Sequence, residues 1–268
     1  MLKRRRHVGA PLPGSGRTMS PPSLPRRLRI ALRRRVRRHP KLLALVRLAK
    51  YGPYRGLVDD RSRDALLVRA RAEGWRILYL GSGGRRQRGM INLDITWDTG
   101  PDVVGDGLCL PFADETFDAI FCESVIEHVP DPEAFLAAAS RSLKYGGHWY
   151  IEVPFLCPRH ADADFQRWTV EGFREALRRT GLEPVSGGAH TGPAFMLFWV
   201  LREWLSLSLS LGIRRLFPLL FWGLGFLLSP LLLLDPLLMR LPRSDGLASA
   251  FCHVARRPRP ARPDREHP

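Results

Sequence analysis

The feature that most constrains the fold is the stretch ILYLGSGGRRQRGMINLD at residues 77–94. An apolar strand ends abruptly in GSGG, and a second apolar strand, MINL, follows with no room for a full helix between them. Glycines in such a turn let backbone N–H groups approach a ligand closely. A dinucleotide-binding G-x-G-x-x-G motif would need glycine at position 86, where the chain has Arg86, so the spacing argues against that motif.

Residues 75–157 alternate between strand-like and helix-like segments. We expect strands at RILYL, INLDI, DVVGD, FDAIFCE and HWYIEVPF. A helix is expected from Pro132 to Leu143, with Asp131 as its N-cap and KYGG as its stop, and another over residues 169–181. This alternation predicts an α/β fold whose parallel sheet is covered on its faces.

The net charge of +16 is concentrated at one end of the chain. The first 58 residues contain 17 Lys/Arg and no Asp/Glu, whereas the remaining 210 contain 25 Lys/Arg and 26 Asp/Glu. A nucleic-acid enzyme normally carries basic residues around the site itself, so the nearly neutral body argues against that class. The four cysteines are widely spaced, which predicts neither a metal site nor a disulfide and favours a reducing compartment.

The basic end divides into two segments. Residues 1–23 are rich in Pro, Gly and Ser, which predicts a disordered arm; a transit peptide remains an alternative. Residues 24–58 show apolar residues every four positions among arginines, which predicts basic amphipathic helices. Such helices either attach to an anionic membrane surface or pack on their own domain.

The last third of the chain is dominated by Leu, Phe and Trp over residues 194–241. Residues 216–234 form a 19-residue run without a charge, long enough to span a bilayer core of about 30 Å. Prolines and glycines interrupt the run, so one unbroken helix is not expected. Residues 242–257 return to a strand-like pattern, and residues 258–268 form a polar tail predicted to be disordered.

Several motifs in order resemble the class I S-adenosylmethionine-dependent methyltransferases: LGSGG, NLD, VVGDGLCLPFADETFDAIFCESVIEHVPDPEAF and SLKYGGHWYIEVPF. RGMINLD is similar to the short connection found in one subgroup. The resemblance implies a Rossmann-like, doubly wound, seven-stranded sheet. Residues 59–193 would form the methyltransferase core, residues 194–241 a hydrophobic helical insertion, and residues 242–257 the final strand.

The resemblance also implies S-adenosylmethionine as cofactor. By this mapping the cofactor contacts are Gly81, Ser82, Gly83, Asp94, Asp106 and Gly107, with Glu123 and Ser124 nearest the sulfonium. The chain departs from the family at two positions: Tyr79 stands where an acid is common, and Arg85 replaces the usual third glycine.

Candidate acceptor-side residues follow the fourth and fifth expected strands. His128 and His160 are possible bases for removing the acceptor's proton, although the EHV motif that contains His128 can equally be structural. The loop PRHADADFQRWT places His160 with Asp164, Arg167 and Trp168, which could bind a hydroxylated acceptor. The alternative is an internal ion pair that holds the loop.

The insertion precedes the last strand of the same sheet, so both of its ends must lie on one side of a membrane. A two-pass hairpin, an interfacial helical pair, or a soluble cap or dimer interface satisfies this condition. We favour a cytoplasmic enzyme attached at the inner membrane face, methylating a small molecule, lipid or lipid-linked glycan. The alternatives are a catalytically silent scaffold and, less favoured, a nucleic-acid methyltransferase. The sequence leaves the oligomeric state open.

Overall fold

The computed structural model describes residues 60–260. The predicted disordered arm (1–23), the predicted amphipathic helices (24–58) and residues 261–268 of the predicted tail lie outside the described residues.

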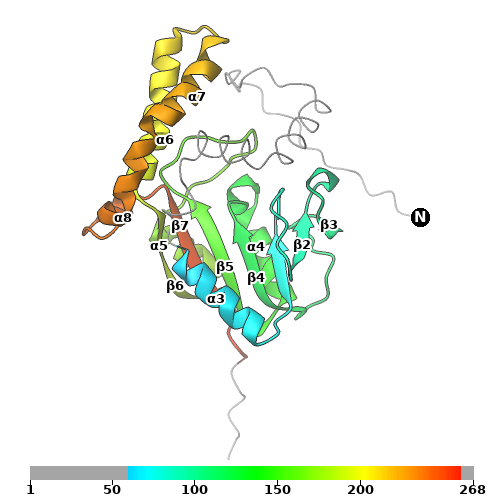
Figure 1. The fold of residues 1–268 in the computed structure, drawn as a ribbon. Helices are drawn as coiled ribbons and strands as arrows, with labels where there is room; N and C mark the ends of the chain where they lie inside the picture. Colours follow the sequence, from blue (N-terminus) through cyan, green and yellow to red (C-terminus); the bar gives the residue numbers. More distant parts are fainter. Residues whose placement is uncertain (1–59, 261–268) are drawn as a thin grey trace, which may run out of the picture.

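A seven-stranded sheet forms the centre of the domain (Figure 1). Its strand order is β3-β2-β1-β4-β5-β7-β6, and β7 runs antiparallel to the other six strands. This arrangement confirms the predicted doubly wound, Rossmann-like sheet with an inserted last strand. The strands are β1 (Ile77–Leu80), β2 (Ile91–Asp94), β3 (Val103–Val104), β4 (Phe117–Glu123), β5 (Leu143–Pro154), β6 (Glu183–Thr191) and β7 (Ala250–Arg256).

Helices cover both faces of the sheet. On one face α4 (Pro132–Ser142) and α5 (Val170–Arg179) contribute to the larger apolar core, whereas α3 (Arg61–Ala72) packs on the other face. The Asp131 side chain caps α4 by accepting from the backbone N–H of Ala134 at 2.9 Å, as the sequence predicted. Strand β4 is buried along almost its whole length because it lies between these two layers.

Two local assignments differ from the sequence-based expectation. The helix α4 ends at Ser142, one residue earlier than predicted, and β5 begins at once. The KYGG segment therefore lies within a strand; the backbone N–H of Gly146 donates to the carbonyl of Arg257, and that of Arg257 donates to the carbonyl of Gly147. Strand β6 was not assigned from sequence, since its SGG segment breaks the apolar alternation on which strand assignments depend.

The apolar insertion forms a helical hairpin, with α6 (Pro193–Ser210) antiparallel to α7 (Leu216–Leu228), followed by η4 (Ser229–Leu234) and α8 (Asp235–Leu238). Figure 1 shows it projecting from the side of the domain that carries β6 and β7. It leaves the sheet after Thr191 and returns at Ala250, and these two residues are paired across β6 and β7. Both ends of the insertion therefore lie at one place in the sheet.

A buried aspartate fixes the base of the hairpin. The Asp235 carboxylate accepts from the backbone N–H groups of Ala194 and Phe195 at 2.7 and 3.0 Å, which caps the start of α6. A Cβ at Gly192 would lie 2.3 Å from Asp235 Oδ1, so glycine is required at that position. Asp235 at the start of α8 thus fixes the start of α6.

Apolar side chains remain exposed along the hairpin at spacings of three, four or seven residues. Within residues 60–260, the run Leu216–Leu238 is the one helical segment long and apolar enough to cross a membrane, and only 11% of its most apolar window is buried. The exposed apolar stripes comprise Leu197, Val200, Trp204, Leu207 and Leu211 on α6 and just after it, and Leu219, Trp222, Phe226, Leu233 and Leu237 on α7 to α8.

Candidate active site

The glycine turn after β1 is fastened to the end of β2. The backbone N–H groups of Gly81 and Ser82 both donate to the carbonyl of Leu93 at 2.9 Å. The N–H of Gly83 donates to Asp94 Oδ2 at 2.6 Å. The short connection predicted from sequence therefore forms one compact unit at the carboxyl edge of the sheet, where open α/β sheets bind their ligands.

Two of the predicted cofactor glycines are required by close packing. Gly81 has a φ of 72°, and a Cβ there would lie 2.3 Å from a methyl carbon of Val125. Gly107 follows β3, and a Cβ there would lie 2.3 Å from the ring of Phe135. Any side chain at either position would displace its neighbour.

Of the two predicted aspartates, Asp94 is the last residue of β2, and Asp106 follows the adjacent strand β3. Asp94 is 8% exposed, and its second oxygen accepts from the backbone N–H of Thr96 at 3.1 Å. Asp106 is exposed and accepts from the backbone N–H of Leu108 at 2.9 Å. Both carboxylates lie at the same edge of the sheet as the glycine turn, so one extended ligand can contact all three features.

Glu123, at the end of β4, is the centre of a polar network. Its Oε1 accepts from Arg63 Nε of α3 at 2.5 Å, and its Oε2 accepts from the Tyr79 hydroxyl at 2.8 Å. Arg85 lies 3.6 Å from Oε2. Burial and the Glu123 charge raise the pKa of Tyr79 above its ordinary value, so the phenol keeps its proton. A carboxylate therefore does lie beside Tyr79, but it comes from the neighbouring strand.

Ser124 connects this network to the end of β5. It adopts a left-handed conformation (φ 52°), and its hydroxyl donates to Glu152 Oε1 at 3.1 Å. The second Glu152 oxygen lies 3.5 Å from His190 Nε2. Burial lowers the pKa of His190, but Glu152, Cys252 and Asp60 together outweigh burial and raise that pKa to about 9.

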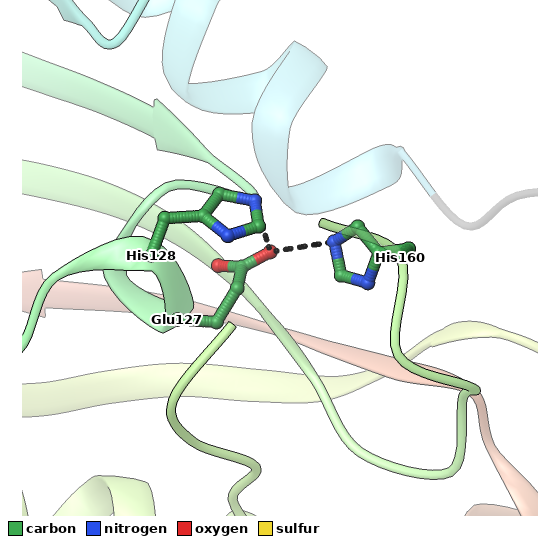
Figure 2. Close-up of side chains that lie close together, drawn as sticks. All are labelled: Glu127, His128 and His160. Atoms are coloured by element: carbon green, nitrogen blue, oxygen red, sulfur yellow. Dashed lines mark ion pairs between the residues drawn. The ribbon is translucent and has the colours of Figure 1, made fainter. Parts of the chain in front are cut away.

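A second polar cluster lies in η3 (Ile126–His128) and the loop after β5. Figure 2 shows the Glu127 carboxylate between the rings of His128 and His160. Glu127 Oε1 lies 3.5 Å from His160 Nε2 and 3.7 Å from His128 Nε2. Glu127 is fully buried, and neither of its carboxylate oxygens has a hydrogen-bond partner within residues 60–260.

The loop after β5 is held by internal contacts. Asp164 receives both NH1 and NH2 of Arg167 and also the backbone N–H of His160, the latter at 3.0 Å. Burial opposes its ionisation, but these donors hold the pKa of Asp164 at about 2. Trp168 packs its ring 5.5 Å from that of Phe173. Asp164, Arg167 and Trp168 thus make contacts within the chain that hold the loop, and His160 is the member that faces Glu127 and His128.

The two candidate bases differ in their contacts. Contacts with Cys157 and Glu127 raise the pKa of His160 to about 10, so its ring is cationic near neutrality. His128 Nδ1 lies 2.6 Å from the carbonyl oxygen of Ala163; a carbonyl only accepts, so this nitrogen carries the proton. His128 Nε2 is then left as a proton acceptor when the ring is neutral.

Four residues of these networks were not selected from sequence: Arg63, Glu127, Glu152 and His190. Glu127 had a signal, because it is a carboxylate beside a candidate base in an otherwise apolar segment. Arg63 had none, since it lies 60 residues from Glu123 and precedes every recognised motif.

Residues 87–151 match the family model described as a methyltransferase domain. These residues therefore resemble a methyltransferase domain. The match begins after the glycine turn and ends within β5, so it includes Asp94, Asp106 and His128 but not His160. Comparison with curated proteins gave no match.

Solved structures that resemble the chain include a putative sarcosine dimethylglycine methyltransferase from Galdieria sulphuraria, at 16% identity over 74% of this chain and 85% of that one, with a TM-score of 0.47. Phosphoethanolamine N-methyltransferase 2 from Haemonchus contortus, solved with S-adenosyl-L-methionine, is 18% identical over 74% of this chain and 53% of that one, with a TM-score of 0.46. The 1,6-didemethyltoxoflavin-N1-methyltransferase from Burkholderia thailandensis, solved with 1,6-didemethyltoxoflavin and S-adenosylhomocysteine, is 15% identical over 82% of this chain and 90% of that one, with a TM-score of 0.44.

Proposed function

We propose that this chain is an S-adenosylmethionine-dependent methyltransferase that works at a membrane surface. The observation that carries the proposal is the glycine turn fastened to Asp94 at the carboxyl edge of the sheet. The family match over residues 87–151 is consistent with it. The acceptor is a small molecule, a lipid or a lipid-linked glycan.

In this proposal the cofactor extends along the edge from β4 to β3. Gly81, Ser82 and Gly83 approach its methionine part, and Asp94 accepts from the ribose hydroxyls. Asp106 and Gly107 lie at the adenine, while Glu123 and Ser124 border the sulfonium. Glu123 supplies the carboxylate that related enzymes often have at the position of Tyr79, because its Oε2 lies 2.8 Å from the Tyr79 hydroxyl.

Binding of S-adenosylmethionine to the full chain, measured by calorimetry, tests the cofactor site. We expect saturable binding that Asp94→Ala weakens by about tenfold or more, since a hydrogen bond to a charged group contributes roughly 1.5–3 kcal/mol. Asp98→Ala, in the exposed helix η2 (Trp97–Thr99), is the matched control and should leave the affinity unchanged. Absence of saturable binding in the unmodified chain would instead favour a catalytically silent scaffold.

On the acceptor side, His128 Nε2 is the atom suited to remove a proton, and the cationic His160 is suited to bind an acceptor oxygen. Methyl-label transfer from the cofactor into fractionated cell lipids and glycans identifies the acceptor. With that acceptor, His128→Ala should lower kcat by about 10²–10⁴-fold, as expected for loss of a general base. His148→Ala is the control, because His148 lies toward the other end of β5, beside Trp75. An unchanged kcat in His128→Ala would remove His128 from the chemistry.

The exposed stripes of the hairpin support attachment to one membrane face. Arg214 and Arg215 lie exposed at its tip and Arg240 and Arg243 exposed at its base, where they can contact lipid phosphates. A helical pair with apolar stripes between basic ends is suited to lie in the interface of an anionic bilayer. Because both ends of the insertion meet at the sheet, attachment needs no crossing of the membrane.

Flotation of the full chain with vesicles containing anionic phospholipid tests attachment. The triple variant Trp204→Gln, Leu207→Gln, Leu211→Gln should lower partitioning by about tenfold or more, since each buried apolar side chain contributes roughly 1.5–3 kcal/mol. Val68→Gln with Ile95→Gln removes similarly exposed apolar residues away from the hairpin and should have no effect. Equal flotation of both variants would contradict the proposal.

A further inference from the structure

The cluster of Glu127, His128 and His160 has the composition and spacing of a metal site. One ligand atom from each side chain lies within 4.8 Å of the other two. The Nε2–Oε1 distances of 3.5 and 3.7 Å are close to the edge of a tetrahedron around zinc, which is roughly 3.3–3.6 Å for metal–ligand bonds near 2.0–2.2 Å. All three side chains point toward one another (Figure 2).

The outer nitrogens of both histidines are already engaged. His128 Nδ1 lies 2.6 Å from the carbonyl of Ala163, and His160 Nδ1 lies 3.3 Å from Asp164 Oδ2. Metal-binding histidines almost always donate their second ring N–H to a carbonyl or carboxylate in this way. These contacts turn both Nε2 atoms toward Glu127 and fix their orientation.

Glu127 supplies an independent observation. Its side chain is 0% exposed, and neither carboxylate oxygen accepts a hydrogen bond from any residue between 60 and 260. A buried carboxylate that has no hydrogen bond and faces two imidazole nitrogens is suited to share a metal ion with them. We propose that Glu127, His128 and His160 bind one divalent transition-metal ion, with zinc the best fit to two imidazoles and one carboxylate.

Three protein ligands leave a coordination position open, as in catalytic zinc sites. A bound ion would occupy His128 Nε2, so metal binding and proton removal by that nitrogen exclude each other in one molecule. The inference is independent of methyl transfer, because its readout is metal content rather than activity.

Equilibrium dialysis of the metal-free full chain against Zn²⁺, followed by elemental analysis, is the test. We expect one ion per chain, and Glu127→Gln should weaken the affinity by more than about 100-fold, since even outer contacts contribute 10–100-fold. Glu133→Gln, an exposed position on α4 that pairs with Arg179, is the matched control and should bind as the unmodified chain does. A chain that binds no zinc, or binds it equally in Glu127→Gln, overturns the proposal.

Two further measurements keep the test decisive if Glu127→Gln folds poorly. Co²⁺ should give visible d–d absorption in the unmodified chain and in His148→Ala, but not in His128→Ala or His160→Ala. Asp164→Asn, which perturbs the acceptor at His160 Nδ1 without removing a ligand, should weaken Zn²⁺ binding by about 10–100-fold. Identical cobalt spectra in all the histidine variants would place the ion elsewhere and refute the assignment.

Discussion

Glu123 and Glu127 are two buried carboxylates, four residues apart, in opposite circumstances. Glu123 receives a guanidinium on one oxygen and a phenol on the other, both from its own chain. Glu127 is more deeply buried, yet it has no hydrogen-bond donor within residues 60–260 and faces only two imidazole nitrogens. Glu123 therefore has hydrogen-bond partners within the domain, whereas Glu127 is arranged with two histidines as if to bind a ligand from outside the chain, such as the metal ion proposed above.

The difference distinguishes a carboxylate that stabilises the domain from one that is suited to bind a ligand. A paired charge tolerates burial because its partners replace the water it has lost. A buried carboxylate without hydrogen bonds persists only where the surrounding contacts hold it, and such positions are characteristic of binding sites. The following changes test this contrast, from the largest expected effect to the smallest.

Arg63→Ala should lower the free energy of unfolding by up to about 3–5 kcal/mol, because it removes the closer cation from the largely buried Glu123 and leaves only the more exposed Arg85, 3.6 Å from Oε2. Urea unfolding of the full chain measures the loss. Arg69→Ala is the matched control, since Arg69 of the same helix pairs with Glu73 at its C-terminal end in a contact that is about half exposed, and its loss should change stability much less. Equal losses would mean that burial does not distinguish the two pairs.

Zinc at about 100 times its dissociation constant should raise the free energy of unfolding by about 2.7 kcal/mol, if the folded state alone binds it. In Glu127→Gln the same concentration should leave stability unchanged. Thermal unfolding with and without Zn²⁺ measures both. A rise that persists in Glu127→Gln would remove the contrast between the two carboxylates.

Tyr79→Phe should cost about 1.5 kcal/mol, because Glu123 loses its neutral donor but keeps Arg63. Tyr145→Phe, at a 42% exposed tyrosine, serves as the control and should change little. Urea unfolding detects the difference, and a loss as large as that of Arg63→Ala would show that the phenol is as important as the cation.

The smallest effect concerns Ser124, between the two carboxylates. Ser124→Ala loses the hydrogen bond to Glu152 but keeps the left-handed backbone, and it should cost about 1 kcal/mol. Ser124→Gly loses the same bond while relieving the backbone, so it should be more stable than the alanine variant by about 0.5–1 kcal/mol. Paired urea unfolding curves decide the order, and the reverse order would deny strain at this turn.

The parts of the molecule that depend on local sequence patterns could be predicted from the sequence. The alternation of apolar strands and helices, the Asp131 cap and the glycine turn are all read within a few neighbouring residues. Strand β6 was missed because SGG removes the side chains that carry the alternation. The boundary at Ser142 was shifted because β5 starts without a loop.

The residues of the candidate site could be predicted only in part, because their contacts join distant segments of the chain. His128 and His160 were singled out by their motifs, but their meeting across Glu127 depends on how the loop after β5 folds back. The pair of Arg63 with Glu123 joins residues 60 positions apart. Such encounters arise from tertiary packing, and no local pattern records them.

The pairing of Thr191 with Ala250 has a consequence for how related chains can vary. Residues 192–249 leave and re-enter the sheet at one pair of residues, so the register of β6 and β7 does not depend on the length of the segment between them. The hairpin of α6 and α7 can therefore differ in length or sequence between related chains while the two strands keep their pairing. Grafted between the same two strands of a related domain, this hairpin should confer the vesicle binding proposed above.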